Sequence, residues 1–305
     1  MTLPASSPSA TPTATGQFII MPIREEEVAF HNGSVRLGGT LLLPQLPDAQ
    51  RLCPGVALVH GSGDDPRDDY RIFAEYFAAR GIATLIYDKR GVGASTGNWR
   101  SGTFAELAGD ALAAVHLLAA RPEIDPQRVG LWGCSEGGWV APLAAARSTE
   151  VRFLVAISAP GMSPAQQEHY RRRLIIEASS ASQITRSRRM ATVHLMFGLL
   201  RHTPKRMWPG MVGYFSRTMD FDPLPTWKQV TQPVLLIFGA ADASVPPQES
   251  ADLIAHALHT AGHHDCTIRI FPGGDHGIRY RDETTQKLTF VPGYLDSLVA
   301  WILAR

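Results

Sequence analysis

Short apolar runs alternate with longer amphipathic stretches through most of the chain. The apolar runs lack alternating polar positions, which is typical of strands buried on both faces of a sheet. Four of them read GVALVH, IATLIYD, RVGLWG and VRFLVAISAP, and helical patterns such as TFAELAGDALAAVHLLAAR separate them. Repeated strand–helix–strand units predict a doubly wound α/β fold with a mostly parallel sheet.

The N-terminal part follows another pattern. Residues 26–44 hold two alternating runs around Asn32-Gly33, a pair typical of hairpin turns, so we expect antiparallel strands there. Residues 1–16 are rich in Ser, Thr, Pro and Ala and cannot bury enough apolar surface to offset the entropy of ordering. We expect them to form a disordered tail.

Residues 161–230 interrupt the strand–helix series. They are rich in Arg and Met, show helical spacing and contain no strand-like run. The series then resumes with PVLLIFGAAD and CTIRIFPGGDHG. The sequence thus predicts one α/β core from residues 17–160 and 231–305, with residues 161–230 inserted as a helical cap.

Composition and charge narrow the classes of function. Hydrophobic residues make up 45% of the chain and the formal net charge is +1, so there is no excess of positive charge to collect nucleic acid. Three cysteines without a Cys-x-x-Cys pair fit a reduced, cytoplasmic protein better than a disulfide scaffold. The start lacks the pattern of a secretory signal, and no stretch has the apolar length of a membrane span. We expect no nucleic-acid partner and no membrane span, and a homodimer stays open.

A serine lies between glycines where a strand pattern meets a helix pattern. Residues 133–137 read GCSEG, which matches the G-x-S-x-G turn. In that strained turn the residues two before and two after the serine must be small, because the backbones pass closely. The turn would expose the Ser135 hydroxyl beside a helix N-terminus, whose N–H groups favour negative charge. The alternative is a glycine-rich packing turn with an incidental serine.

A serine hydroxyl needs a base and a group that orients the base. Asp242 and His276 each follow a late strand pattern, in the order serine, acid, histidine that this arrangement requires. Asp275 adjoins His276 but points elsewhere in most backbone geometries. Asp88 ends an earlier strand, where we expect it to hold its own loop with Arg90.

The other histidines give a weaker signal. Four of them cluster around the end of one predicted helix, namely His256, His259, His263 and His264. No carboxylate or cysteine at ligand spacing completes a metal site there, so we expect a solvated helix end and no metal. Three more lie in the insertion, where a substrate contact stays open: His169, His194 and His202.

Acyl transfer also needs hydrogen-bond donors for the oxyanion. Residues 60–63, HGSG, follow the first parallel strand pattern, where a glycine turn can aim a backbone N–H above Ser135. We assign the two donors to the N–H groups of Ser62 and Glu136. A plain strand-to-helix turn is the alternative, and it accounts less easily for the whole four-residue stretch.

The insertion carries apolar and basic side chains with two interpretations each. Six residues could line an apolar acyl pocket or could pack as core between cap and sheet: Met196, Phe197, Met207, Trp208, Met211 and Tyr214. Two arginine clusters could form a solvated helix face, which we favour, or a site for an anionic leaving group such as the phosphates of coenzyme A. They consist of Arg171, Arg172, Arg173, Arg186, Arg188 and Arg189.

Over residues 26–305 the chain resembles the α/β-hydrolase superfamily. The resemblance rests on HGSG, YDKRGVGAST, GCSEGG, GAADASVP and GGDHG, in that family's order. It implies Ser135 as nucleophile, His276 as base, Asp242 as its orienting acid and a helical cap. The motifs are most similar to a subgroup of serine esterases and acyl-thioesterase-like hydrolases, some of them dipeptidyl-aminopeptidase-like. Serine at the nucleophile position argues against relatives that carry Cys or Asp there.

These features predict a serine hydrolase that cleaves carboxylic esters or related acyl bonds of a small-molecule substrate. The reaction would pass through an acyl-enzyme and need no cofactor. An acyl-CoA thioesterase or a small aminopeptidase-like amidase would use the same residues. A non-catalytic binding protein with this fold is a further alternative, although such proteins commonly lack a triad member and none is missing here.

Overall fold

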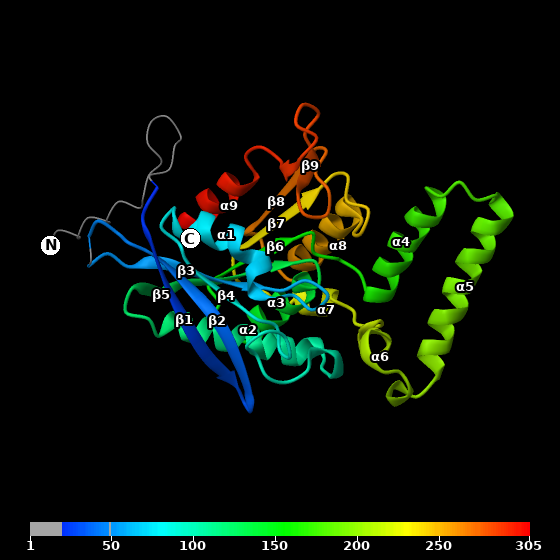
Figure 1. The fold of residues 1–305 in the computed structure, drawn as a ribbon, viewed down its shortest axis with the longest axis horizontal. Helices are drawn as coiled ribbons and strands as arrows, with labels where there is room; N and C mark the ends of the chain where they lie inside the picture. The colour runs from blue at the N-terminus through cyan, green and yellow to red at the C-terminus, as the bar shows by residue number, and fades with distance from the viewer. Residues whose placement is uncertain (1–19, 49) are drawn as a thin grey trace.

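The computed structural model describes residues 20–48 and 50–305, so the predicted tail at residues 1–16 lies outside the described residues. Within them the chain forms an eight-stranded sheet in the order β1-β2-β4-β3-β5-β6-β7-β8 (Figure 1). The strands are β1 Ile23–Asn32, β2 Val35–Pro44, β3 Cys53–Val59, β4 Ala83–Tyr87, β5 Ile124–Cys134, β6 Phe153–Ile157, β7 Val234–Gly239 and β8 Cys266–Phe271. The β1–β2 and β2–β4 pairs are antiparallel, and every pair from β4 to β8 is parallel. The prediction of a mostly parallel sheet with N-terminal antiparallel strands is confirmed.

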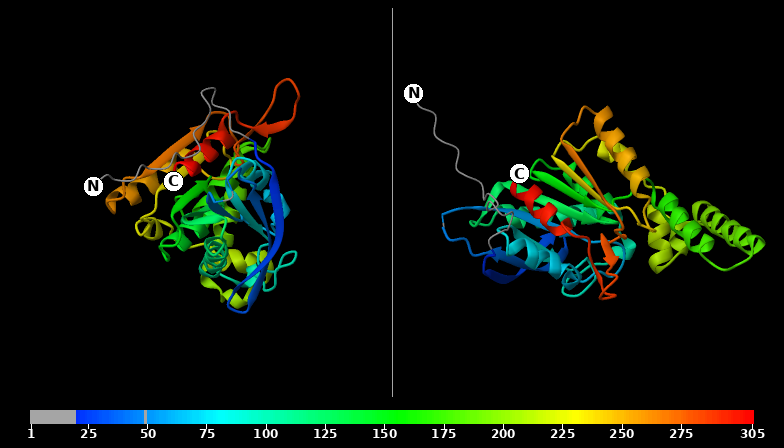
Figure 2. Two further views of the ribbon diagram at one scale, coloured as in Figure 1. Left: turned by 90° about the vertical axis from the view of Figure 1, so that its left-hand side faces the viewer. Right: turned by 90° about the horizontal axis from the view of Figure 1, so that it is seen from above.

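Helices cover both faces of the sheet (Figure 2). Along β7, Leu235 and Ile237 pack toward the layer of α1 and α9, whereas Leu236 and Phe238 pack toward α2, α3 and α8. Such strands are apolar at every position because both faces are buried. The helices are α1 Arg71–Ala78, α2 Phe104–Ala119, α3 Gly137–Ala145, α7 Leu224–Trp227, α8 Pro247–Thr260 and α9 Tyr294–Leu303. A small hairpin of β9 Arg279–Arg281 and β10 Leu288–Phe290 precedes α9.

Three helices between β6 and β7 project from one end of the molecule (Figure 1). They are α4 Pro164–Glu177, α5 Gln183–His202 and α6 Gly210–Thr218, which we call the cap. Ser163 starts α4 by accepting the N–H of Gln166, and Ser182 starts α5 in the same way. The cap has a small apolar core of its own: Ala165, Val193, Phe197, Leu200 and Met219. Among the described residues, no helix combines the length and apolar character needed to cross a membrane.

Candidate active site

Ser135 occupies a strained turn between β5 and α3. Its φ is 54°, a left-handed value that a non-glycine residue rarely adopts. A Cβ added to Gly133 would lie 2.4 Å from the carbonyl oxygen of Gly137, and one added to Gly137 would lie 2.7 Å from the oxygen of Val59. The close approach of these backbones therefore requires glycine on both sides of the serine.

Asp242 and His276 form a hydrogen-bonded pair beyond the ends of β7 and β8. The Asp242 carboxylate is buried, and its Oδ1 accepts the backbone N–H groups of Ser244 and Val245 at 2.7 and 2.9 Å. Its Oδ2 lies 2.8 Å from Nδ1 of His276. Because the carboxylate holds the proton on Nδ1, Nε2 is left free to accept a proton.

Neighbouring residues fix the backbone around His276. Ser158 directly follows β6 and has a φ of 46°, and its hydroxyl donates to the carbonyl oxygen of His276 at 3.0 Å. The carboxylate of Asp275 instead accepts the N–H groups of Gly277 and Arg279 at 2.8 and 2.9 Å. Asp275 is thus committed to its own turn, and Asp242 is the carboxylate that contacts the imidazole.

A cavity of about 430 Å³ opens above Ser135 and His276, between the core and the cap. Of the six cap residues considered for an acyl pocket, four line it: Met196, Phe197, Met211 and Tyr214. Met207 and Trp208 do not. Met207 is 61% exposed, and the indole of Trp208 donates to the hydroxyl of Thr203 at 2.8 Å.

Several residues that line the cavity were not among the sequence-based candidates. The apolar ones are Phe104, Trp139, Pro164, Leu200, Val212 and Phe215. The polar ones include Gln167 and Glu168 of α4, and Arg171 and Arg172 of the first arginine cluster also face this cavity. The helical spacing in the sequence identifies a helix here, but it does not tell which side of the helix faces the core.

Ser62 and Glu136 lie on the same cavity as Ser135. In the described part of the chain, neither backbone N–H donates to a protein acceptor. The Glu136 side chain is 2% exposed, with Oε1 accepting the Lys89 ammonium at 2.7 Å and Oε2 accepting the Ser62 hydroxyl at 3.2 Å. Lys89 was not among the sequence-based candidates. Its signal was three successive charged residues directly after a buried strand.

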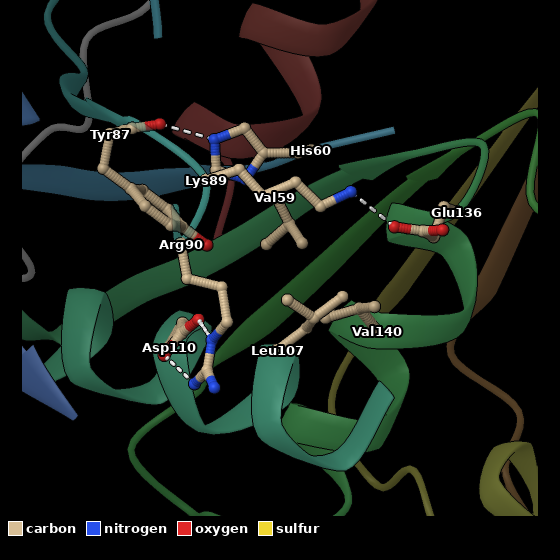
Figure 3. Close-up of a pocket in the computed structure, with 9 residues that line it drawn as sticks. All are labelled: Val59, His60, Tyr87, Lys89, Arg90, Leu107, Asp110, Glu136 and Val140. Atoms are coloured by element: carbon tan, nitrogen blue, oxygen red, sulfur yellow. Dashed lines mark hydrogen bonds and ion pairs between the residues drawn. The ribbon is translucent and has the colours of Figure 1, made fainter. Parts of the chain in front are cut away.

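The prediction that Arg90 pairs with Asp88 is wrong. Asp88 does hold its own loop, by accepting the N–H groups of Arg67 and Ala94 at 2.9 and 2.8 Å. The guanidinium of Arg90 instead makes two hydrogen bonds of 2.6 Å to Asp110 on α2 (Figure 3). Backbone donors already occupy the Asp88 carboxylate, so Arg90 extends toward the helix that covers it.

Two other groups near the site are poor candidates for nucleophile or base. Burial raises the pKa of the Cys134 thiol to about 12, so the thiolate is not populated at neutral pH. Burial, with the charge of Lys89, lowers the pKa of His60 to about 3. His60 is therefore neutral, and its Nε2 lies 2.5 Å from the carbonyl oxygen of Tyr87. The described residues also contain no group of three or more His, Cys, Asp or Glu that could hold a metal ion.

Comparison with known proteins assigns the family. The model of the alpha/beta hydrolase family matches residues 56–285. The thiohydrolase apmlB of Arthrinium phaeospermum is 34% identical over 122 residues, which cover 40% of this chain and 40% of that protein. The esterase EstD of Thermotoga maritima is 26% identical over 239 residues, which cover 75% of this chain and 56% of the esterase. Both matches thus span less than two thirds of the relative.

The similarity of fold extends over nearly the whole chain. The crystal structure of a hypothetical protein from Pseudomonas aeruginosa superposes with a TM-score of 0.65 at 20% identity, covering 99% of this chain and 98% of that one. At this identity the likeness concerns the fold alone. Because the family model matches most of the sequence, and because relatives include an esterase and a thiohydrolase, the chain belongs to the alpha/beta hydrolase family and is a hydrolase.

Proposed function

We propose that the protein is a serine hydrolase that cleaves carboxylic esters through an acyl-enzyme on Ser135. The observation that carries the proposal is the 2.8 Å bond between His276 Nδ1 and Asp242, on the same cavity as a serine held at a φ of 54°. In this mechanism Ser135 Oγ attacks the ester carbonyl, and His276 Nε2 takes the hydroxyl proton and gives it to the departing alcohol. Water then attacks the acyl-enzyme with His276 again as base, and releases the acid.

The negative charge on the carbonyl oxygen needs donors in place before the reaction. The backbone N–H groups of Ser62 and Glu136 fill this role in the proposal. Two observations support this role. Both residues line the cavity, and within the described part of the chain neither N–H donates a hydrogen bond to the protein. Glu136 also immediately precedes α3, so its N–H belongs to the positive end of that helix.

The walls of the cavity indicate the acyl group. Its lining includes Met196, Phe197 and Met211 of the cap together with Phe104 and Trp139 of the core. Side chains of this kind bind a hydrocarbon chain by removing it from water, and methionine adapts to its shape. We therefore propose that residues 161–230 act as a cap over an apolar acyl group.

A substrate panel tests this function. p-Nitrophenyl esters of straight-chain acids should be hydrolysed, with KM falling as the chain lengthens until it fills the cavity, by up to about fourfold per methylene. Aminoacyl p-nitroanilides should be turned over far more slowly, because the two carboxylates that line the cavity, Glu136 and Glu168, are already paired with lysine and arginine side chains and are not open to a free amino group. Equal kcat/KM for anilides and esters would contradict the esterase assignment and favour the amidase alternative.

A second candidate, thioester hydrolysis with an anionic leaving group, is favoured by one feature of the cavity. Arg171 and Arg172 line it and share the carboxylate of Glu168, with hydrogen bonds of 2.5 to 2.9 Å. These bonds, against the effect of burial, hold the pKa of Glu168 below its usual value. Two guanidinium groups and one carboxylate leave a net positive charge on this wall, which suits a phosphate or carboxylate.

Paired arginine substitutions distinguish the two candidates. If the leaving group is anionic, R171Q/R172Q should raise KM for an acyl-CoA about tenfold, since charge-assisted hydrogen bonds contribute about 1.5 to 3 kcal/mol. KM for the uncharged p-nitrophenyl ester of the same acid should stay the same.

The matched control is R188Q/R189Q, which removes two exposed arginines of the cap that do not line the cavity. It should leave both KM values unchanged. Equal KM for acyl-CoA in both double variants, at low and high salt, would contradict the thioesterase candidate and leave a plain esterase.

A further inference from the structure

Lys89 is a buried cation beside the candidate oxyanion site. It lies two residues after the end of β4, is 2% exposed, and its Nζ lies 4.3 Å from the centroid of the Trp99 ring. In Figure 3 its side chain runs toward Glu136, while that of Arg90 turns away toward Asp110. A buried ammonium is costly unless its hydrogen bonds are satisfied, so its two acceptors show what it holds in place.

One acceptor is the carbonyl oxygen of Gly61, at 2.8 Å. That carbonyl shares a planar peptide with the N–H of Ser62, and the two groups of a trans peptide point in opposite directions. Because Lys89 holds the oxygen, the N–H is fixed on the other side of the peptide. The N–H of Gly61 is held as well, by the Tyr70 hydroxyl at 2.7 Å.

The other acceptor is the carboxylate of Glu136, at 2.7 Å. Glu136 follows Ser135 in the chain, and its second carboxylate oxygen accepts the hydroxyl of Ser62 at 3.2 Å. An unpaired buried carboxylate so near the site would oppose the negative charge of the oxyanion. The ammonium of Lys89 offsets that charge. It also connects the two donor segments, because it binds both the carbonyl oxygen of Gly61 and the carboxylate of Glu136.

We propose that Lys89 is a positioning residue that orients the Gly61–Ser62 peptide, and with it the N–H of Ser62, toward the oxyanion of the substrate. The hydrogen bond to the Gly61 oxygen also polarises this peptide, which makes its N–H a stronger donor. This inference rests on the proposed function, because it assumes an oxyanion formed by attack of Ser135. Lys89 then has two roles: it neutralises the buried carboxylate of Glu136, and it orients the Gly61–Ser62 peptide.

The two roles separate when both charges are removed together. K89M leaves Glu136 buried without its partner and should lower both the melting temperature and kcat. K89M/E136Q removes both charges, and such replacements of buried ion pairs are often neutral for stability. The double variant should therefore recover the melting temperature. Its kcat for a p-nitrophenyl ester should stay about 100-fold low, as when one oxyanion donor is lost, with KM within about twofold of wild type.

The neighbouring pair Arg90–Asp110 provides a matched control. It is also buried, starts from the next residue along the chain and points away from Glu136 toward Asp110 on α2. R90M/D110N should change the melting temperature but leave kcat within about twofold. A loss of kcat equal to that of K89M/E136Q would show that any buried ion pair here acts through general stability, and would overturn the proposal.

The remaining outcomes separate this inference from the proposed function. Wild-type kcat in K89M/E136Q, with turnover abolished in Ser135→Ala, would mean that Lys89 only neutralises Glu136, and the inference would fail alone. Normal turnover in Ser135→Ala would instead remove the proposed function. Low kcat in K89M/E136Q, with a wild-type melting temperature and unchanged KM, supports the positioning role.

Discussion

Ser135→Ala is expected to lower kcat for ester hydrolysis by about a millionfold, which is the loss seen when the nucleophile of a serine triad is removed. The change deletes one hydroxyl from a cavity wall, and alanine can occupy the turn because it carries the same Cβ that serine already places there at a φ of 54°. The variant should therefore fold and still bind substrate. Steady-state kinetics, with unfolding followed in parallel, measures both.

Cys134→Ala is the control for this result. The Cys134 thiol adjoins Ser135, but its pKa of about 12 keeps it protonated. Cys134→Ala should retain turnover of the same order as wild type. Residual hydrolysis in Ser135→Ala that disappears when Cys134 is also replaced would contradict the assignment, because it would make the thiol the nucleophile.

Asp242→Asn is expected to lower kcat by about ten-thousandfold, which corresponds to about 5 kcal/mol of transition-state stabilisation. The amide can keep the contact with Nδ1 only by donating to it, so it favours the imidazole tautomer whose Nε2 carries the proton and cannot act as base. The amide oxygen can still accept hydrogen bonds from the backbone N–H groups of Ser244 and Val245, so the loop should keep its conformation.

Asp275→Asn is the matched control, one residue before His276. Its carboxylate accepts backbone N–H groups of its own turn, so the variant should lose some stability but keep kcat within about tenfold of wild type. Loss of turnover in Asp275→Asn together with near-normal turnover in Asp242→Asn would contradict the choice of acid.

The fold could be predicted from the sequence because its signals are local. Strands buried on both faces must be apolar at every position, as Val234–Gly239 is, and this pattern separates them from the amphipathic helices. The strained turn could be predicted for a similar reason. The contacts of Gly133 and Gly137 leave no room for a side chain, so glycine at these two positions in the sequence indicates the close approach of the backbones.

The partners of charged residues and the walls of the cavity could not be predicted. Lys89 and Arg90 are adjacent, yet they reach opposite partners, Glu136 and Asp110, which are distant in the sequence. Likewise, Arg171 lines the cavity whereas Met207 is exposed. The partners of Lys89 and Arg90 depend on the course of the loop after β4, and the cavity wall depends on how the cap elements are rotated against their neighbours. Side-chain composition specifies neither.

The assignment of Ser135 as nucleophile is tested by the site of covalent labelling with a fluorophosphonate, which reacts with an activated serine. The tryptic peptide that spans residues 129–147 contains one serine, Ser135, so a mass increment on this peptide can be assigned by fragmentation. We expect a single adduct on Ser135 in the wild type, much slower labelling in Asp242→Asn and none in Ser135→Ala. An adduct on another residue, or labelling that persists in Ser135→Ala, would contradict it.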